Sequence, residues 1–199
     1  MFAHIRGMVE EILPDRAVIE AGGVGYELFC SVATLRSLKA GTEQKLHVHF
    51  HLSLSQDVMA LYGFSTLEER TMFRRLISVS RIGPKLALSV LGTLSVNDIT
   101  LAILTENAAA FDKVPGMGRK TAARVLLELK EKVGGEDMSS GPMADASPTK
   151  MDVRTEAIAA LVSLGYDGVT AGRAVANVQD CDKVEEMITL ALRQMARKG

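Results

Sequence analysis

The sequence predicts a mixed α+β protein of three parts: a small closed β-barrel, a central helical domain and a short helical bundle. Three observations predict this organisation. Short β-rich runs between glycine-rich turns fill the first third, helical periodicity begins near residue 65, and residues 134–151 lose almost every branched apolar side chain. The predicted domains are therefore 1–64, 65–133 and 152–199, with a flexible linker at 134–151.

The composition is that of an ordinary soluble protein. Of the 199 residues, 47% are apolar and 24% are charged, which is enough to bury one or two cores. Cys30 and Cys181 lie far apart without a CxxC spacing, so we expect neither a disulfide framework nor structural zinc, and a reducing compartment fits. The N-terminal stretch MFAHIRGMVEEIL carries charges throughout, which is typical of neither a signal peptide nor a membrane span. We expect a cytoplasmic protein.

The barrel is predicted from strand patterns in residues 1–64. The segment AVIEAGGVGYELFCS holds two β-rich runs around a glycine-rich turn, which is typical of a hairpin. In QKLHVHFHLSL apolar and polar side chains alternate, as on a strand with one buried and one solvent-facing side. The apolar side carries Leu46, Val48, Phe50 and Leu52, and the polar side carries His47, His49 and His51. Short strands of this kind favour a closed barrel, which LYGF at 61–64 ends.

The segment 65–133 shows the helical period. Ser65 or Thr66 can cap a helix, because a glutamate follows three positions after each. Pro84 suits the first turn of a second helix through KLALSVL. The run RKTAARVLLELKEKV gathers apolar residues on one helix face and is stopped by the Gly-Gly pair at 134–135. That face carries Ala122, Val125, Leu126, Leu129 and Val133.

The last third begins with the linker GGEDMSSGPMADASPTKM, whose composition cannot bury a core. After it, TEAIAALVSLGY, VTAGRAVANV and DKVEEMITLALRQMARK predict three short helices. Gly165 ends the first helix, and Asp182 with Glu185 forms a capping box for the third. A tethered bundle of this size is most often a docking module.

Two turns in the central domain share one pattern. VSRIGPK at 79–85 and VPGMGRK at 114–120 lie thirty-five positions apart, each between two helical runs. The second turn follows the helix-hairpin-helix spacing: apolar anchors on both helices, two glycines in the turn and an alanine where the helices cross. The first turn keeps this frame but has Arg81 where the pattern has glycine. Arg81 either adopts the glycine-like dihedral at some cost or reshapes the turn.

The chemistry of such turns suits a phosphate group. Glycine lets main-chain N–H groups approach an anion, and the following helix adds N-terminal donors and a positive dipole end. Residues 65–133 hold 11 Lys and Arg against 7 Asp and Glu, although the whole chain has a net charge of −1. We expect the turns to grip the sugar-phosphate strand without reading bases. The residues expected to do so are Arg81, Gly83, Lys85, Gly116, Gly118, Arg119 and Lys120.

Rival motifs each lack a required part. GMGRKTA approaches a P-loop, but Arg119 separates glycine from lysine and no strand precedes the motif. The histidine row has no evident carboxylate or cysteine partner for a metal, and no Ser/His/Asp or Cys/His arrangement stands out. The absence of tryptophan and the 5% aromatic content disfavour a base-stacking single-strand binder. We therefore expect no catalytic residue, no metal and no cofactor.

The whole chain, in order, resembles a known family. A β-rich unit ending in DVMALYGF, the turns SRIGPKLAL and VPGMGRKTAARVLLELK, a loose linker and a helical tail with ALVSLGY are similar to the RuvA family, bacterial proteins that bind Holliday junctions. The resemblance implies an N-terminal OB-fold β-barrel, an all-α double helix-hairpin-helix domain, and a mobile, UBA-like three-helix C-terminal domain.

The resemblance also implies partners. RuvA proteins form fourfold tetramers on four-way junction DNA, and two tetramers can sandwich one junction. Each subunit holds one arm through its two turns, which maps onto Ile82, Gly83 and Lys85 and onto Gly116, Gly118 and Lys120. We also expect Met117, between the two glycines of the second turn, to belong to the DNA-binding residues. The C-terminal domain docks RuvB, the hexameric ATPase that drives branch migration in recombination and repair, and the nuclease RuvC works on the same junction. The family's own subunit is not an enzyme. The docking surface maps onto Leu161, Leu164, Tyr166 and Leu192.

The family's tetramer centre carries an acidic pin, usually a Glu-Asp pair, which corresponds here to Gln56 and Asp57. Only one carboxylate remains per subunit. Because such pins act by repelling phosphates at the crossover, we expect weaker repulsion in this protein.

Two other functions stay open from the residues themselves. The protein could be a structure-selective nuclease or a repair glycosylase that uses the turns to bind DNA. Such an enzyme would need a catalytic acid cluster or a lysine in a pocket. Alternatively, the turns are plain helix–helix corners in a protein-interaction scaffold whose helical tail binds the partner.

Overall fold

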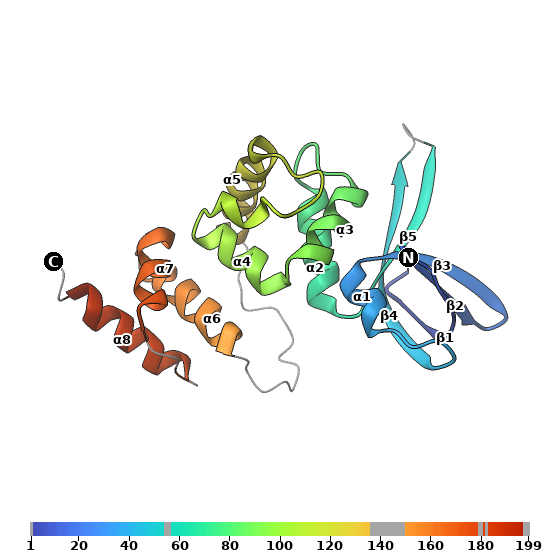
Figure 1. Ribbon diagram of the computed structural model, residues 1–199, viewed down its shortest axis with the longest axis horizontal. Coiled ribbons are helices and arrows are strands. Elements are labelled where there is room, and N and C mark those ends of the chain that lie inside the picture. Colours follow the sequence, from blue (N-terminus) through green and yellow to red (C-terminus); the bar gives the residue numbers. More distant parts are fainter. Residues whose placement is uncertain (1, 54–56, 136–149, 179–180, 182, 197–199) are drawn as a thin grey trace. The chain divides into compact units, whose positions relative to one another are not determined.

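The computed structural model describes residues 2–53, 57–135, 150–178, 181 and 183–196 (Figure 1). Internal contacts divide the chain into two units. The first is Met1–Val96 with Lys113–Met117, and the second is Asn97–Asp112 with Gly118–Gly199. The predictions for Gln56, for Asp182 and for most of the linker fall outside the described residues.

The first unit begins with the predicted barrel. Its five strands close in the order β1-β2-β3-β5-β4, and all neighbours pair antiparallel except β3 with β5, which run parallel. Parallel neighbours require a crossover connection, which here runs through α1 and β4. The bounds are β1 (His4–Ile12), β2 (Arg16–Ala21), β3 (Val24–Cys30), α1 (Val32–Ser37), β4 (Glu43–Ser53) and β5 (Val58–Phe64). This closed barrel confirms the OB-fold prediction.

The predicted glycine turn between β2 and β3 is confirmed. Gly22 and Gly23 have φ of 63° and 81°, the positive values that a two-residue hairpin of this twist requires and that glycine adopts without strain. The barrel core lies on the alternate residues of the strands. Its most buried members are Val9, Ala17, Ile19, Leu28 and Leu46.

Strand β4 departs from its predicted pattern in two ways. Leu46 and Val48 are buried as expected, but Leu52 is 55% exposed where β4 and β5 extend as a hairpin beyond the barrel (Figure 1). The histidine side, expected to face solvent, is only partly exposed, since His47, His49 and His51 are all half-buried. The ring of His49 packs edge-on against Phe73 of α2, with 5.4 Å between ring centroids. Alternation identifies the two faces of a strand, but it does not say which of them another helix covers.

Helices α2 (Leu67–Ile77) and α3 (Pro84–Thr93) flank the first turn. Thr66 caps α2 as predicted, because its hydroxyl accepts a hydrogen bond of 3.1 Å from the N–H of Glu69. Pro84 is the first residue of α3, also as predicted. Phe73 of α2 packs on the barrel through the rings of Tyr62 and Phe64, at centroid distances of 5.0 and 4.9 Å.

The second unit holds most of α4 and the remaining helices. The bounds are α4 (Val96–Leu104), the 3₁₀ helix η1 (Ala108–Phe111), α5 (Arg119–Gly135), α6 (Lys150–Ser163), α7 (Gly168–Ala176) and α8 (Val184–Ala196). Helix α5 buries the predicted apolar face as far as its side chains are described, since Ala122, Val125, Leu126 and Leu129 are all at most 5% exposed. The side chain of Val133, the fifth predicted member, lies outside the described part. It ends within the predicted Gly-Gly pair, at Gly135.

The three predicted C-terminal helices form a bundle, α6–α8 (Figure 1). Gly165, with φ of 96°, follows the end of α6 as predicted. Asp167 caps α7 by accepting hydrogen bonds of 3.0 Å from the N–H groups of Val169 and Thr170. Hydrogen bonding to Thr170 lowers the pKa of this carboxyl. The fully buried side chains of the bundle include Ala157, Leu161, Ala171, Met187 and Ala191.

Neither Cys30 nor Cys181 forms a disulfide bond. Burial raises the pKa of the Cys30 thiol to about 12. No single helix in the described part of the chain is long and apolar enough to cross a membrane; α3 and α4 reach that length and hydropathy only when taken together.

Candidate nucleic-acid interface

The first predicted turn connects α2 with α3. Arg81 has φ of 69°, in the left-handed region that favours glycine. The N–H of Ile82 donates a hydrogen bond of 3.1 Å to the carbonyl of Val79, and both of these side chains are buried. Of the two possibilities that the sequence left open, the structure therefore has the first: arginine adopts the glycine-like dihedral.

The second turn follows the same backbone path. Gly116 has φ of 82°, and the N–H of Met117 donates a hydrogen bond of 3.1 Å to the carbonyl of Val114. The helix after each turn also starts alike. The carbonyl of Gly118 accepts from Ala122 at 2.9 Å, as that of Gly83 accepts from Ala87 at 3.0 Å.

Both turns rest on the same buried frame, repeated at a spacing of thirty-five residues. No member of the frame is more than 8% exposed. The paired positions are Leu76 with Phe111, Val79 with Val114, Ile82 with Met117, Ala87 with Ala122, and Leu91 with Leu126. The apolar side chains thus fix the turns from inside and leave the outer backbone open.

Seven of the nine predicted DNA-binding residues have exposed side chains or backbone: Arg81, Gly83, Lys85, Gly116, Gly118, Arg119 and Lys120. The side chains of Ile82 and Met117 are buried, so these two residues can meet a ligand only through their main chain. Gly83 caps α3 without any side-chain hydrogen bond. The first N–H groups of a helix have no partner within it, so a helix start without a side-chain hydrogen bond is suited to an anion.

Helix α3 links the two turns within the first unit. The hydroxyl of Ser89 donates a hydrogen bond of 3.1 Å to the carbonyl of Pro115. A Cβ atom on Gly116 would lie 3.5 Å from Cδ1 of Leu86, which is ordinary contact. The helix that starts at the first turn therefore also packs against the second.

The other predicted sites belong to other elements of the chain than the turns. Asp57 is exposed beside the tip of the β4–β5 hairpin with φ of 51°. In the C-terminal bundle, Leu164 is 63% and Tyr166 39% exposed, and Leu192 is half-buried. Leu161 is fully buried in the bundle core, so its side chain supports this surface from below.

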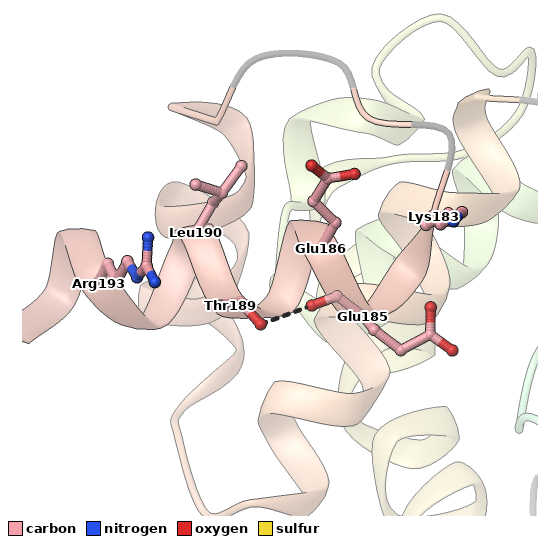
Figure 2. Close-up of a pocket in the computed structure, with 6 residues that line it drawn as sticks. All are labelled: Lys183, Glu185, Glu186, Thr189, Leu190 and Arg193. Atoms are coloured by element: carbon pink, nitrogen blue, oxygen red, sulfur yellow. Dashed lines mark hydrogen bonds between the residues drawn. The ribbon is translucent and has the colours of Figure 1, made fainter.

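The outer face of α8 differs from that surface. Figure 2 shows a shallow depression whose lining carries both signs of charge, and in which the hydroxyl of Thr189 donates to the carbonyl of Glu185 at 2.8 Å. The lining residues are Lys183, Glu185, Glu186, Thr189, Leu190 and Arg193. Among the described residues, no three His, Cys, Asp or Glu side chains gather to hold a metal ion.

One polar cluster was not predicted from the sequence. Glu69 was expected only as a partner in a helix cap, but its carboxylate is buried and accepts hydrogen bonds from Ser31 and Thr34 of the barrel. No local signal could have found this cluster, because its members come from segments more than thirty residues apart.

The chain matches three family models. The model described as the RuvA N terminal domain covers residues 1–63, a SAM-like helix-hairpin-helix tandem covers residues 73–131, and the RuvA C-terminal domain covers residues 152–196.

Full-length relatives agree with these matches. The chain is 37% identical to a protein of Ruminiclostridium cellulolyticum, over 98% of this chain and 100% of the relative. It is 39% identical to one of Acetivibrio thermocellus (99% and 100%) and 40% identical to one of Cronobacter sakazakii (97% and 98%). All three relatives are named Holliday junction branch migration complex subunit RuvA. With its barrel, its tandem turns and its three-helix tail in the same order, the chain belongs to the RuvA family.

Proposed function

We propose that this protein is the junction-binding subunit of a Holliday junction branch migration complex, and that it recognises four-way DNA by shape rather than by sequence. One observation carries the proposal: two turns of the same backbone path, each exposing glycine backbone and basic side chains at the start of a helix. The names of the relatives support it.

The turns suit phosphates for a physical reason. Main-chain N–H groups and the positive end of a helix dipole favour an anion whatever base it carries. Lys85 and Lys120 each add one positive charge, at corresponding positions of the two helices that follow the turns. The binding they give is therefore independent of sequence and falls steeply as salt rises.

Preference for a four-way junction then comes from assembly. Four subunits around one axis present four pairs of turns, and linked weak contacts add up only on a cross-shaped molecule. The extended β4–β5 hairpin carries apolar side chains suited to contacts between subunits: Leu52 (55% exposed), Val58 (39%) and Met59 (75%). The same hairpin carries Asp57, which would stand near the tetramer centre as the remaining acid of the pin.

The C-terminal bundle is the proposed docking module for the hexameric ATPase RuvB. The exposed apolar pair Leu164 and Tyr166, together with the half-buried Leu192, gives an apolar contact surface. The charged face of α8 offers no comparable one (Figure 2). In this proposal the protein works in the cytoplasm, leaves catalysis to RuvB and RuvC, and acts as a tetramer or as two tetramers on one junction.

A gel-shift titration tests the proposal. An immobile four-way junction and a linear duplex with the same arm sequences are titrated with the full chain at modest ionic strength. Tighter binding to the junction, equal for two unrelated sets of arm sequences, is the expected result. Equal affinity for both DNA shapes would overturn the proposal. Cleavage of labelled junctions in the presence of Mg²⁺ would instead indicate a nuclease.

A further inference from the structure

Ser31, Thr34 and Glu69 are the buried polar side chains of the described part of the chain, and they meet at one place. Their exposed fractions are 1%, 0% and 6%. Ser31 and Thr34 lie at the start of α1 on the barrel, and Glu69 lies in the first turn of α2. The meeting point is therefore the joint between the barrel and the helices that carry the first turn.

Both oxygens of the Glu69 carboxylate accept hydrogen bonds. Oε1 accepts from the hydroxyl of Ser31 at 2.5 Å, and Oε2 accepts from the hydroxyl of Thr34 at 2.6 Å. The N–H and the hydroxyl of Ser65 each lie 3.3 Å from Oε2. Ser65 connects β5 with α2, so three segments converge on one carboxylate.

The residues that donate to Glu69 are also hydrogen-bonded to one another. The hydroxyl of Ser31 accepts from the N–H of Thr34 at 3.0 Å, which caps α1. The hydroxyl of Thr34 accepts from the N–H of Ser65 at 3.1 Å. A buried carboxylate is strongly destabilising unless such donors surround it, so the network tolerates little change in the relative position of its members.

The apolar contacts between the barrel and α2 and α3 are less directional than these hydrogen bonds. Phe73 packs on Tyr62 and Phe64, and ring contacts of this kind are compatible with a wider range of geometries than hydrogen bonds are. Helix α1 also packs on α3, since a Cβ on Gly92 would lie 3.5 Å from Cβ of Val32. The segment that binds Glu69 thus contacts both helices that flank the first turn.

We propose that Glu69 is a positioning residue that fixes the angle between the barrel and the first DNA-binding turn, and that this angle determines the preference for four-way junctions. The inference rests on the proposed function, in which the barrels form the centre of a tetramer. A rotation at each joint would misplace four turns at once on a junction, whereas a linear duplex engages its turns without that geometric demand.

The main test replaces Glu69 by glutamine. An amide has the same shape but donates on one side, so the new side chain cannot accept from Ser31 and from Thr34 together. We expect junction affinity to fall about tenfold while duplex affinity and its salt dependence stay the same. Glu68→Gln changes the neighbouring, exposed carboxylate of α2 and is the matched control, expected to keep the wild-type ratio of the two affinities.

A distance measurement reads the angle directly. Spin labels at Lys39→Cys on the barrel and Thr93→Cys at the end of α3, in a Cys181→Ser background, report the distance across the joint. Glu69→Gln is expected to broaden or shift this distance, and Glu68→Gln to leave it unchanged.

The outcomes separate cleanly. An unchanged affinity ratio and distance, or an equal loss of affinity for both DNA shapes, would overturn the inference. If Glu69→Gln does not fold, the replacement is Thr34→Val, which removes one hydroxyl donor and keeps the size of the side chain. It is measured with the same two readouts and judged in the same way. If the wild-type protein itself shows no junction preference, the proposed function fails, while the distance still reports whether Glu69 fixes the joint.

Discussion

The two turns, 79–85 and 114–120, reach the same backbone shape from different residues. At the position with positive φ the second turn has glycine at 82° and the first has arginine at 69°. Both keep the buried frame and the hydrogen bond of 3.1 Å that closes the turn. The shape is therefore set by packing beneath the turn and by that hydrogen bond, and glycine makes it cheaper without being required.

The turns also differ in what precedes them. The first follows α2, which packs on the barrel through Phe73 and the Glu69 network, and the second follows the short helix η1. Four experiments can break or sharpen the comparison.

The experiment with the largest expected effect tests whether the two turns contribute equally to DNA binding. Lys85→Glu and Lys120→Glu should each weaken binding about tenfold, and the double variant roughly a hundredfold, because each puts a negative charge beside a phosphate. Titrations at several salt concentrations, with junctions and duplexes of different sequence, measure this effect. Lys39→Glu, a charge reversal on the barrel, is the control. A loss confined to particular sequences would contradict phosphate gripping.

The second experiment tests the shared frame. Ala87→Leu and Ala122→Leu insert bulk where each following helix is fully packed, so each should destabilise the protein by about 1–3 kcal/mol. Urea unfolding measures the effect, and Ala123→Leu, on the exposed side of α5, should change stability little. If only one of the two buried alanines is sensitive, the frames are not equivalent.

The third experiment exchanges the residues at positive φ. Arg81→Gly should stabilise the fold by about 0.5 kcal/mol, since relief of strain is partly offset by the freedom of glycine in the unfolded chain. Gly116→Arg should destabilise it by about 1 kcal/mol, because the added Cβ meets only ordinary contact with Leu86. A DNA-binding measurement distinguishes backbone strain from a contact with DNA. Although Arg81→Gly should be more stable, it should bind DNA more weakly than wild type. Equal or tighter binding would show that the arginine makes no contact.

The experiment with the smallest expected effect concerns His49 of β4, which packs against the helix before the first turn. Burial, with help from Arg74, His51 and Arg70, lowers the pKa of His49 from its ordinary value of 6.5. The folded protein therefore favours the neutral ring, and the unfolded chain takes up the proton at higher pH. This contribution to stability is fully present above pH 6.5 and is lost as the pH falls through the lowered pKa. His49→Gln should reduce the drop in Tm between about pH 7.5 and about pH 5.5. The same drop in both proteins would rule out this role.

Much of the fold follows from local pattern. The barrel, the glycine turn at Gly22 and Gly23, the cap at Thr66, the helix start at Pro84 and the three C-terminal helices can be predicted from periodicity and from the residues preferred at helix starts. The tandem turns were predictable too, because their frame repeats at a fixed spacing of thirty-five residues. Each of these signals lies within a few neighbouring residues, where backbone preferences act directly.

Tertiary structure decided what depends on distant partners. It placed His49 under α2, left Leu52 exposed on the hairpin, buried Leu161, and gave Arg81 the dihedral that its sequence context left open. It also brought Ser31, Thr34 and Glu69 together. Burial and hydrogen bonding between segments far apart in the chain depend on how whole elements pack, and a linear pattern carries no record of that packing.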